Sequence, residues 1–365
     1  MWVERSSLLS KNSIDSLIVE LSKNNIKNLF VQIRSRGDAL YYSDIVKMNS
    51  RVQKNFDPLA YILEWSKLLN INIYAWLNTY LIWSAPYEPY DEKHLYYTHP
   101  EWFATDYNGK SDIVIKVKNI QSPNWEGLYL SPNHPEVNIY IYNLVKEIIT
   151  NYPDIDGIHF DYIRFQDEYY GFNKIGMKNF ELNYNFNPKD IYRGLFSKKF
   201  GWSISEKDSI ENLWINYNSD NITNLIRSVK KYIDDNNVEI ELTAAVKSDL
   251  LQSKSKWYQD WGYWIENDIL DFVVVMNYAA SNDKFINKVR IINENLFIDN
   301  LDKKIIMGIS LYNQDESSVA DKIILTNLSG YNKICFFSYN SIKNKSNILN
   351  STRLFYNKKK NILGE

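Results

Sequence analysis

Short apolar runs alternate along this chain with segments of helix length, and this alternation restricts the fold more than any other feature. Strand-like runs occur eight times, the number that a closed parallel (β/α)8 barrel requires. Strands that alternate with helices indicate an α/β fold. The pattern alone fits a doubly wound sheet as well, but the count of eight favours a TIM barrel. The predicted strands are 2–4, 28–33, 72–77, 155–161, 239–246, 270–276, 304–309 and 333–337.

Helices are predicted wherever apolar residues recur at helical spacing between these runs. The clearest start is Asp57-Pro58, an N-cap residue followed by proline at the first helical position. No linker rich in Gly, Ser or Pro interrupts the chain, so we expect a single domain over 1–365, with a core of about 2–345 and a C-terminal helix and tail over 346–365. The predicted helices are 13–23, 59–69, 136–150, 219–234, 256–266, 284–297, 316–327 and 347–356.

Two connections are far longer than ordinary links between a strand and its helix. They span about 78–134, after the third strand, and about 165–218, after the fourth. Both leave a strand at its carboxyl end, which is the face where barrel enzymes build their sites. Both insertions are rich in Trp and Tyr, whose flat faces suit stacking on sugars, contact with a protein partner, or packing of the insertion itself.

The segment Asp156–Arg164 presents two different faces in strand conformation. Ile158 and Phe160 lie on one face, and His159 and Asp161 on the other. A buried parallel strand is normally apolar on both faces. Polar residues near its carboxyl end therefore predict a catalytic position at the barrel mouth. The alternative is a strand whose polar face meets water, with Asp161 paired to Arg164.

Polar or aromatic residues also occur at the ends of five other predicted strands, so the barrel would bring them to the same mouth. We expect sugar hydroxyls to be bound by polar groups, namely Gln32, Arg34, Arg36, Asn78, Arg164, Asn277 and Tyr278. We expect sugar rings to stack on Trp76, Tyr312 and Tyr339. For each residue, packing of the barrel is the alternative.

Composition argues against several other classes of protein. The formal net charge of −2 gives no basic surface for nucleic acid. Cys335 is the only cysteine and the four histidines lack metal-binding spacing, so we expect no metal and no cofactor. No apolar stretch reaches the ~20 residues of a transmembrane segment. No leader precedes the first strand, which predicts a cytoplasmic protein as written, or an extracytoplasmic one if the N-terminus is incomplete. We expect a monomer.

Eight motifs occur in an order that closely resembles the bacterial glycosyl hydrolase-like 10 family, from Trp2 to about Tyr339. The resemblance implies a barrel glycosidase that acts on polysaccharide, with cell-wall (peptidoglycan-type) glycan strands as the substrate class. The motifs are FVQIRSRGDALYYS (30–43), FDPL (56–59), AWLNTY (75–80), HPEW (99–102), YLSPNHPEV (129–137), DGIHFDYIRF (156–165), VVMNY (274–278) and FFSYNS (336–341).

The fourth-strand motif also resembles two larger groups of glycosidases. In α-amylase-like enzymes the pattern DGxRxD ends in the nucleophilic aspartate, which corresponds to Asp161. In chitinase-like enzymes DGxDxDxE ends in the acid glutamate, and Ile163 stands at that position. Because this glutamate is absent, the chain departs from the chitinase pattern, which argues against a chitinase mechanism.

Glycoside hydrolysis requires two carboxyl groups across the scissile bond. We expect Asp161 to be one of them, as a nucleophile or a charge-stabilising carboxylate kept ionised by nearby arginines, with His159 orienting it. Asp38 is the first candidate for the second carboxyl, although a structural pairing with an arginine fits it equally well, and Glu4 and Asp249 follow. The competing function is a non-catalytic carbohydrate-binding protein on the same barrel.

Overall fold

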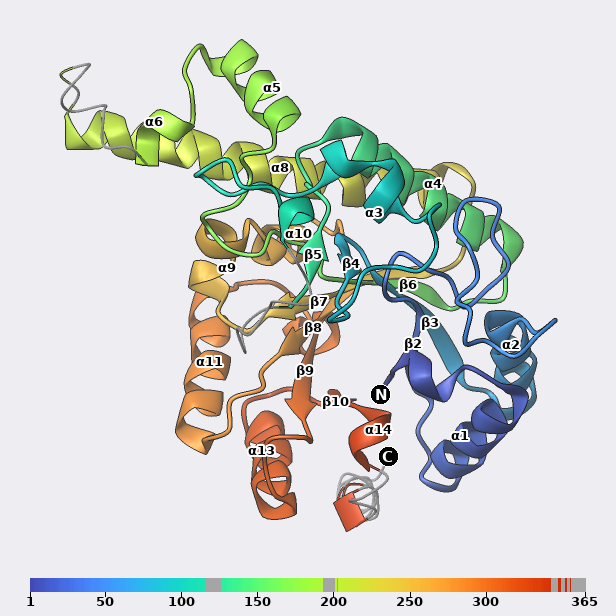
Figure 1. Cartoon of the computed structure of the whole chain (residues 1–365). Helices are drawn as coiled ribbons and strands as arrows, with labels where there is room; N and C mark the ends of the chain where they lie inside the picture. The colour runs from blue at the N-terminus through green and yellow to red at the C-terminus, as the bar shows by residue number, and fades with distance from the viewer. Residues whose placement is uncertain are drawn as a thin grey trace.

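The computed structural model describes residues 1–115, 126–192, 201, 203–342, 347, 348, 352 and 355. Eight parallel strands form one sheet in the order β1-β2-β3-β6-β7-β8-β9-β10, and the sheet curls into a nearly closed barrel (Figure 1). The strands are β1 (Trp2–Val3), β2 (Asn28–Arg34), β3 (Asn72–Asn78), β6 (Gly157–Asp161), β7 (Glu241–Lys247), β8 (Phe272–Met276), β9 (Ile305–Ser310) and β10 (Ile334–Phe337). All eight predicted strands and the predicted TIM-barrel fold are confirmed.

The barrel interior is packed largely with aromatic side chains. Along β2, Leu29, Val31 and Ile33 belong to the large outer core, whereas Phe30 belongs to a separate inner cluster. Because side chains of a strand alternate in direction, this division separates the outward face from the interior. The inner cluster comprises Trp2, Phe30, Tyr74, Trp76, Ala245, Phe272, Val274, Ile306 and Cys335.

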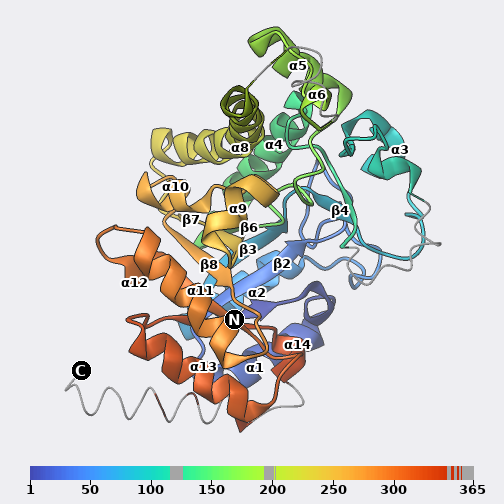
Figure 2. The same cartoon turned by 90° about the vertical axis from the view of Figure 1, so that its left-hand side faces the viewer.

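Helices cover the outer face of the barrel, as Figures 1 and 2 show. At the start of α2 the Asp57 side chain accepts a hydrogen bond from the Ala60 amide at 3.0 Å, with Pro58 at the first position, as predicted. The covering helices are α1 (Lys11–Lys23), α2 (Pro58–Leu69), α4 (Pro135–Asn151), α8 (Ile204–Asp235), α9 (Leu250–Trp257), α10 (Trp261–Glu266), α11 (Asn282–Asn295), α12 (Leu301–Lys304), α13 (Glu316–Leu328) and α14 (Tyr339–Ile342).

Two predicted helices have different bounds in the structure. The helix predicted over 256–266 is two helices, α9 and α10, because Tyr258 adopts a left-handed conformation with φ of 53°. The helix predicted over 219–234 begins much earlier, at Ile204, where Ser203 and Glu206 form a capping box. The helix predicted over 347–356 lies mostly outside the described residues.

The two predicted insertions leave β3 and β6 at their carboxyl ends. The first contains β4 (Leu81–Trp83), α3 (Leu95–Thr98) and β5 (Leu128–Tyr129), and the second contains α5 (Lys174–Tyr184) and α6 (Lys189–Tyr192). The second insertion has its own apolar cluster, in which Phe172 and Phe180 pack on Trp214 of α8. Many of the aromatic residues in this insertion therefore stabilise its own packing and do not face a ligand.

Within the described ranges, no helix has the length and apolar character needed to span a membrane.

Trp2 is the residue of β1 on which we expect barrel closure to depend. Its side chain is 1% exposed, and its indole N–H donates to His159 Nε2 at 3.1 Å. Trp2→Ala should lower the free energy of unfolding by about 3–5 kcal/mol, measured by chemical denaturation, because it leaves a large cavity. Trp2→Phe keeps most of the packing and should cost clearly less. Equal stability of the wild type and Trp2→Ala would contradict this role.

Candidate active site

A cavity of about 730 Å³ lies at the carboxyl ends of the barrel strands. Residues from the ends of β6, β7, β8 and β10 line it, together with residues of α9 and α11. Enzymes with this fold carry their active sites at this face, so the cavity is the candidate active site. Its charged lining residues are Glu126, Asp161, Arg164, Lys247, Asp249, Lys284 and Lys288.

Asp161 is the last residue of β6, and 7% of its surface is exposed. One carboxyl oxygen accepts a hydrogen bond from the Tyr162 amide at 2.7 Å, and the other accepts one from the Trp76 indole at 3.1 Å. Burial outweighs these hydrogen bonds and raises the pKa of Asp161 to about 6. The carboxyl group therefore holds a proton in mildly acidic solution.

The expectation that arginines keep Asp161 ionised is wrong, because burial outweighs the charge of Arg164 and all three arginines bind other groups directly. Arg164 pairs with Glu126. Arg34 donates to the carbonyl oxygens of Asn78 and Thr79. Arg36 donates to Ser84, with its Nε 3.0 Å from the Ser84 hydroxyl.

Glu126 is the second carboxyl group of the cavity, and the sequence analysis missed it. Its carboxylate lies 2.7 Å from an Arg164 nitrogen and 3.6 Å from Lys247 Nζ, and it accepts a hydrogen bond from the Tyr129 hydroxyl at 2.8 Å. Burial opposes ionisation, but the Arg164 and Lys247 charges outweigh it and lower the pKa of Glu126 to about 2. The cavity thus contains one carboxyl group that holds a proton and one that is ionised.

The turn that presents Glu126 depends on the following glycine. Gly127 has φ of 144°, and a Cβ there would lie 2.4 Å from the Trp83 carbonyl oxygen. Only glycine permits this approach to β4, which pairs with β5 directly after the turn. The available sequence signal was the Glu-Gly pair just before the apolar run 128–130, within an insertion on the catalytic face.

Several predicted site residues do lie at this cavity. Arg164, Tyr278 and Tyr312 line it beside Asp161, and Tyr312 is 61% exposed. Trp76 is 2% exposed and holds Asp161 through the indole hydrogen bond, so it positions the carboxyl group instead of offering a stacking surface. The end of β10 contributes Phe337 in place of the predicted Tyr339.

His159 lies below the mouth, inside the barrel, and does not contact Asp161. Its Nε2 accepts from the Trp2 indole, its Nδ1 is 2.9 Å from the Thr243 hydroxyl, and its ring centroid is 4.1 Å from that of Phe30. Burial lowers the pKa of His159 well below its usual value. His159 therefore does not orient Asp161 as expected, because both of its ring nitrogens already have partners in the core.

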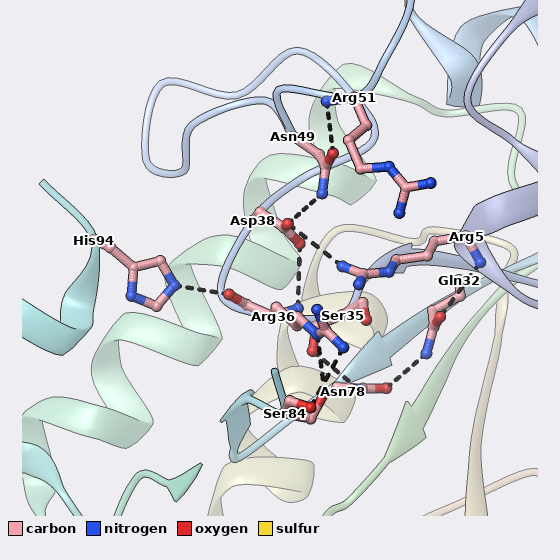
Figure 3. Close-up of polar contacts among 10 residues, drawn as sticks. All are labelled: Arg5, Gln32, Ser35, Arg36, Asp38, Asn49, Arg51, Asn78, Ser84 and His94. Atoms are coloured by element: carbon pink, nitrogen blue, oxygen red, sulfur yellow. Dashed lines mark hydrogen bonds and ion pairs between the residues drawn. The ribbon is translucent and has the colours of Figure 1, made fainter. Parts of the chain in front are cut away.

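Asp38 lies in a separate polar cluster on the β1–β2 side of the mouth (Figure 3). It pairs with Arg5 at 3.6 Å and accepts hydrogen bonds from the Arg36 amide, at 3.1 Å, and from Asn49. In the same cluster Gln32 donates to Asn78 at 3.2 Å. Asp38 does not line the cavity of Asp161. The contacts of Asp38 therefore agree with the alternative interpretation, a structural pairing with an arginine.

Three further predicted residues lie away from the cavity. Arg34 packs against the outer face, 6.0 Å from the Tyr140 ring of α4. Asn277 is fully buried and donates to the Phe285 carbonyl at 3.0 Å. Tyr339 donates to Glu20 of α1 at 2.8 Å. Their polar groups bind the protein itself, so the expectation that they bind sugar is not supported by these contacts.

The aromatic residues of the two insertions could stack on sugars, contact a partner or pack the insertions. None of the described Trp, Tyr or Phe residues in these insertions lines the cavity, and Trp125 and Trp202 lie outside the described residues. The aromatic lining comes from strands, short loops and the end of α9, namely Trp2, Tyr162, Trp257, Tyr278, Tyr312 and Phe337. In the part of the chain that the structure describes, no group of three or more His, Cys, Asp or Glu side chains could hold a metal ion.

The chain is similar to known glycosyl hydrolases of bacteria. It is 24% identical over 290 residues to the glycosyl hydrolase DigH of Escherichia coli K12, an alignment that covers 75% of this chain and 59% of that protein. It is 23% identical over 286 residues to the glycosyl hydrolase YngK of Bacillus subtilis, covering 73% and 49%. The aligned part of the chain thus spans 59% of the length of the first relative and 49% of the second.

Solved structures confirm the fold. The glycoside hydrolase domain of PgaB (BpsB) from Bordetella bronchiseptica superposes with a TM-score of 0.66 at 14% identity, over 97% of both chains. A β-galactosidase from Marinomonas ef1 gives a TM-score of 0.57 at 10% identity, over 93% of this chain and 53% of the other.

A family model described as glycosyl hydrolase-like 10 matches residues 1–324. The ordered motifs, the barrel and this match lead to one conclusion: the chain belongs to the glycosyl hydrolase-like 10 family.

Proposed function

We propose that this chain hydrolyses glycosidic bonds of a polysaccharide at the cavity that contains Asp161 and Glu126, with cell-wall (peptidoglycan-type) glycan strands as the substrate. The observation that carries the proposal is the pair of carboxyl groups in one cavity whose pKa values are shifted in opposite directions. Such a pair separates the acid from the ionised carboxylate in glycosidases. Family membership supports the same reaction class.

In this proposal Asp161 donates its proton to the glycosidic oxygen as the bond breaks. The Trp76 indole and the Tyr162 amide fix the carboxyl group, which orients the proton toward the cavity. Asp161 thereby takes the role of acid, in place of the nucleophile or charge-stabilising carboxylate expected from the sequence.

Glu126 is the ionised partner in this proposal. Its carboxylate stabilises the positive charge that develops on the sugar, by attacking the anomeric carbon or by activating water. Arg164 and Lys247 keep it ionised throughout the pH range in which Asp161 titrates. Tyr278, Tyr312 and Trp257 line the same cavity and offer aromatic surface to sugar rings.

Asp161→Asn should reduce kcat on purified peptidoglycan glycan strands by at least about 10²–10³-fold, because the variant cannot donate the proton. New reducing ends measure hydrolysis, and co-sedimentation with the insoluble strands measures binding, which should persist. Asp38→Asn, in the neighbouring cluster, is the matched control and should retain activity. A wild-type chain that binds the strands and releases no reducing ends would indicate a non-catalytic carbohydrate-binding protein instead.

The pH dependence of kcat/KM should follow the two carboxyl groups. The protonated form of Asp161 is required, and its pKa is about 6, so kcat/KM should fall about tenfold per pH unit above that value. Between about pH 3 and 6 it should be nearly flat, because Glu126, with a pKa of about 2, stays ionised. A profile that instead rises through pH 6 would assign Asp161 as the ionised group.

The raised pKa of Asp161 also predicts that the difference in stability between the wild type and Asp161→Asn depends on pH. The folded state binds this proton more tightly than the unfolded state, so ionisation of Asp161 destabilises the fold as the pH rises from about 4 through 6. Asp161→Asn removes that penalty. Relative to the wild type, the variant should therefore gain up to about 3 kcal/mol between pH 4 and pH 8, measured by denaturant unfolding. A difference that does not change with pH would contradict the buried, protonated carboxyl group.

A further inference from the structure

One face of α11 forms part of the wall of the cavity. The four residues of this helix that line the cavity are Lys284, Asn287, Lys288 and Ile291. Their spacing of three, four and seven residues places them on one helical face. The buried residues of α11, Phe285, Val289 and Ile292, hold the helix against the barrel. The lysines thus belong to a fixed wall of the cavity.

Lys284 stands at a position that does not favour a cation in a helix. Ser281 is the N-cap and accepts a hydrogen bond from the Lys284 amide, so Lys284 is the third residue of α11. The amino end of a helix carries partial positive charge and favours acidic side chains, whereas a lysine there is mildly destabilising. Helix formation therefore does not explain the lysine.

The acidic groups of the cavity are engaged elsewhere. Glu126 is paired with Arg164 and Lys247. Asp249 caps α9 by accepting a hydrogen bond from the Gln252 amide at 3.2 Å. Asp161 is buried with its own two hydrogen bonds. Among the residues that the structure describes, neither Lys284 nor Lys288 forms an ion pair.

The cavity is therefore more positive than the protein around it. Four cationic side chains line it against three acidic ones, of which Asp161 is uncharged below about pH 6. The whole chain, in contrast, has a net charge of −2. A cleft with walls of low dielectric concentrates such an excess and attracts anions.

We propose that Lys284 and Lys288 form a subsite for the carboxylate of an acidic sugar in the substrate chain. The proposal rests on the proposed function, and it specifies the substrate as a polysaccharide whose sugars carry free carboxylates. Trp257 lines the same cavity as the two ammonium groups and offers an aromatic surface to a sugar ring there. Lys247, 5.2 Å from the Trp257 ring, connects this subsite with Glu126.

Binding of two chemically matched glycans tests this subsite. The probes are soluble N-acetylglucosamine–N-acetylmuramic acid strands without peptides, and the same strands after amidation of their carboxylates. Titration calorimetry in the Asp161→Asn background should give about tenfold tighter binding of the acidic strands, because each exposed ion pair contributes a few-fold. K284Q/K288Q should abolish that difference, and added salt should reduce it.

The matched control removes two exposed lysines at the opposite face of the barrel. K303Q/K333Q changes the net charge equally, just before β9 and β10, and should keep the tenfold preference. Equal affinity of the parent for both strands, no binding of either, or loss of the preference in the control as well would overturn the subsite.

The proposed function has a separate readout in these experiments. Chains that retain Asp161 are assayed for new reducing ends on both strands. Hydrolysis of both strands at equal efficiency overturns the subsite and leaves the glycosidase proposal intact. Carboxylate-dependent binding without any hydrolysis overturns the glycosidase proposal and supports the subsite.

Discussion

The ion pair between Arg164 and Glu126 distinguishes the two carboxyl groups of the cavity that are proposed to act in catalysis. Arg164 follows β6 and Glu126 belongs to the insertion after β3, so the pair joins two segments that are distant in sequence. Arg164 pairs directly with Glu126 and acts on Asp161 only through its charge, which is too weak to offset the burial that raises the pKa of Asp161. The direct ion pair thus keeps Glu126 ionised, whereas Asp161, which has no such pair, keeps its proton in mildly acidic solution.

Strand periodicity predicted the direction of the β6 side chains and not their depth. His159 and Asp161 do share the inward face, as expected from their alternation with Ile158 and Phe160. Successive residues on one face are about 6–7 Å apart along a strand, which in a barrel is the spacing between layers of interior side chains. Asp161 therefore reaches the mouth, while His159 lies one layer lower, among Trp2 and Phe30.

The sequence was most informative where local patterns determine structure. Apolar runs and an N-cap before proline located the strands and the start of α2 correctly, since these signals lie within a few residues. It was least informative where a partner distant in sequence determines which contacts a side chain makes. The partners of Asp38, Arg34 and Tyr339 lie on other elements, and no local signal distinguishes an arginine that meets a carboxylate from one that meets carbonyl oxygens. For the same reason Glu126 was missed, because only the fold brings it to Arg164.

The proposed subsite and the proposed acid are coupled through electrostatics. Arg164 and Lys247 lie near Asp161, and burial together with the Arg164 charge lowers the pKa of Lys247 to about 8. A bound carboxylate adds negative charge to the same cavity, which favours the protonated forms of both Asp161 and Lys247. Substrate binding at Lys284 and Lys288 would then raise the pKa of the catalytic acid and stabilise the cations around Glu126. An acidic substrate would in this way help to maintain the protonation states that its own cleavage requires.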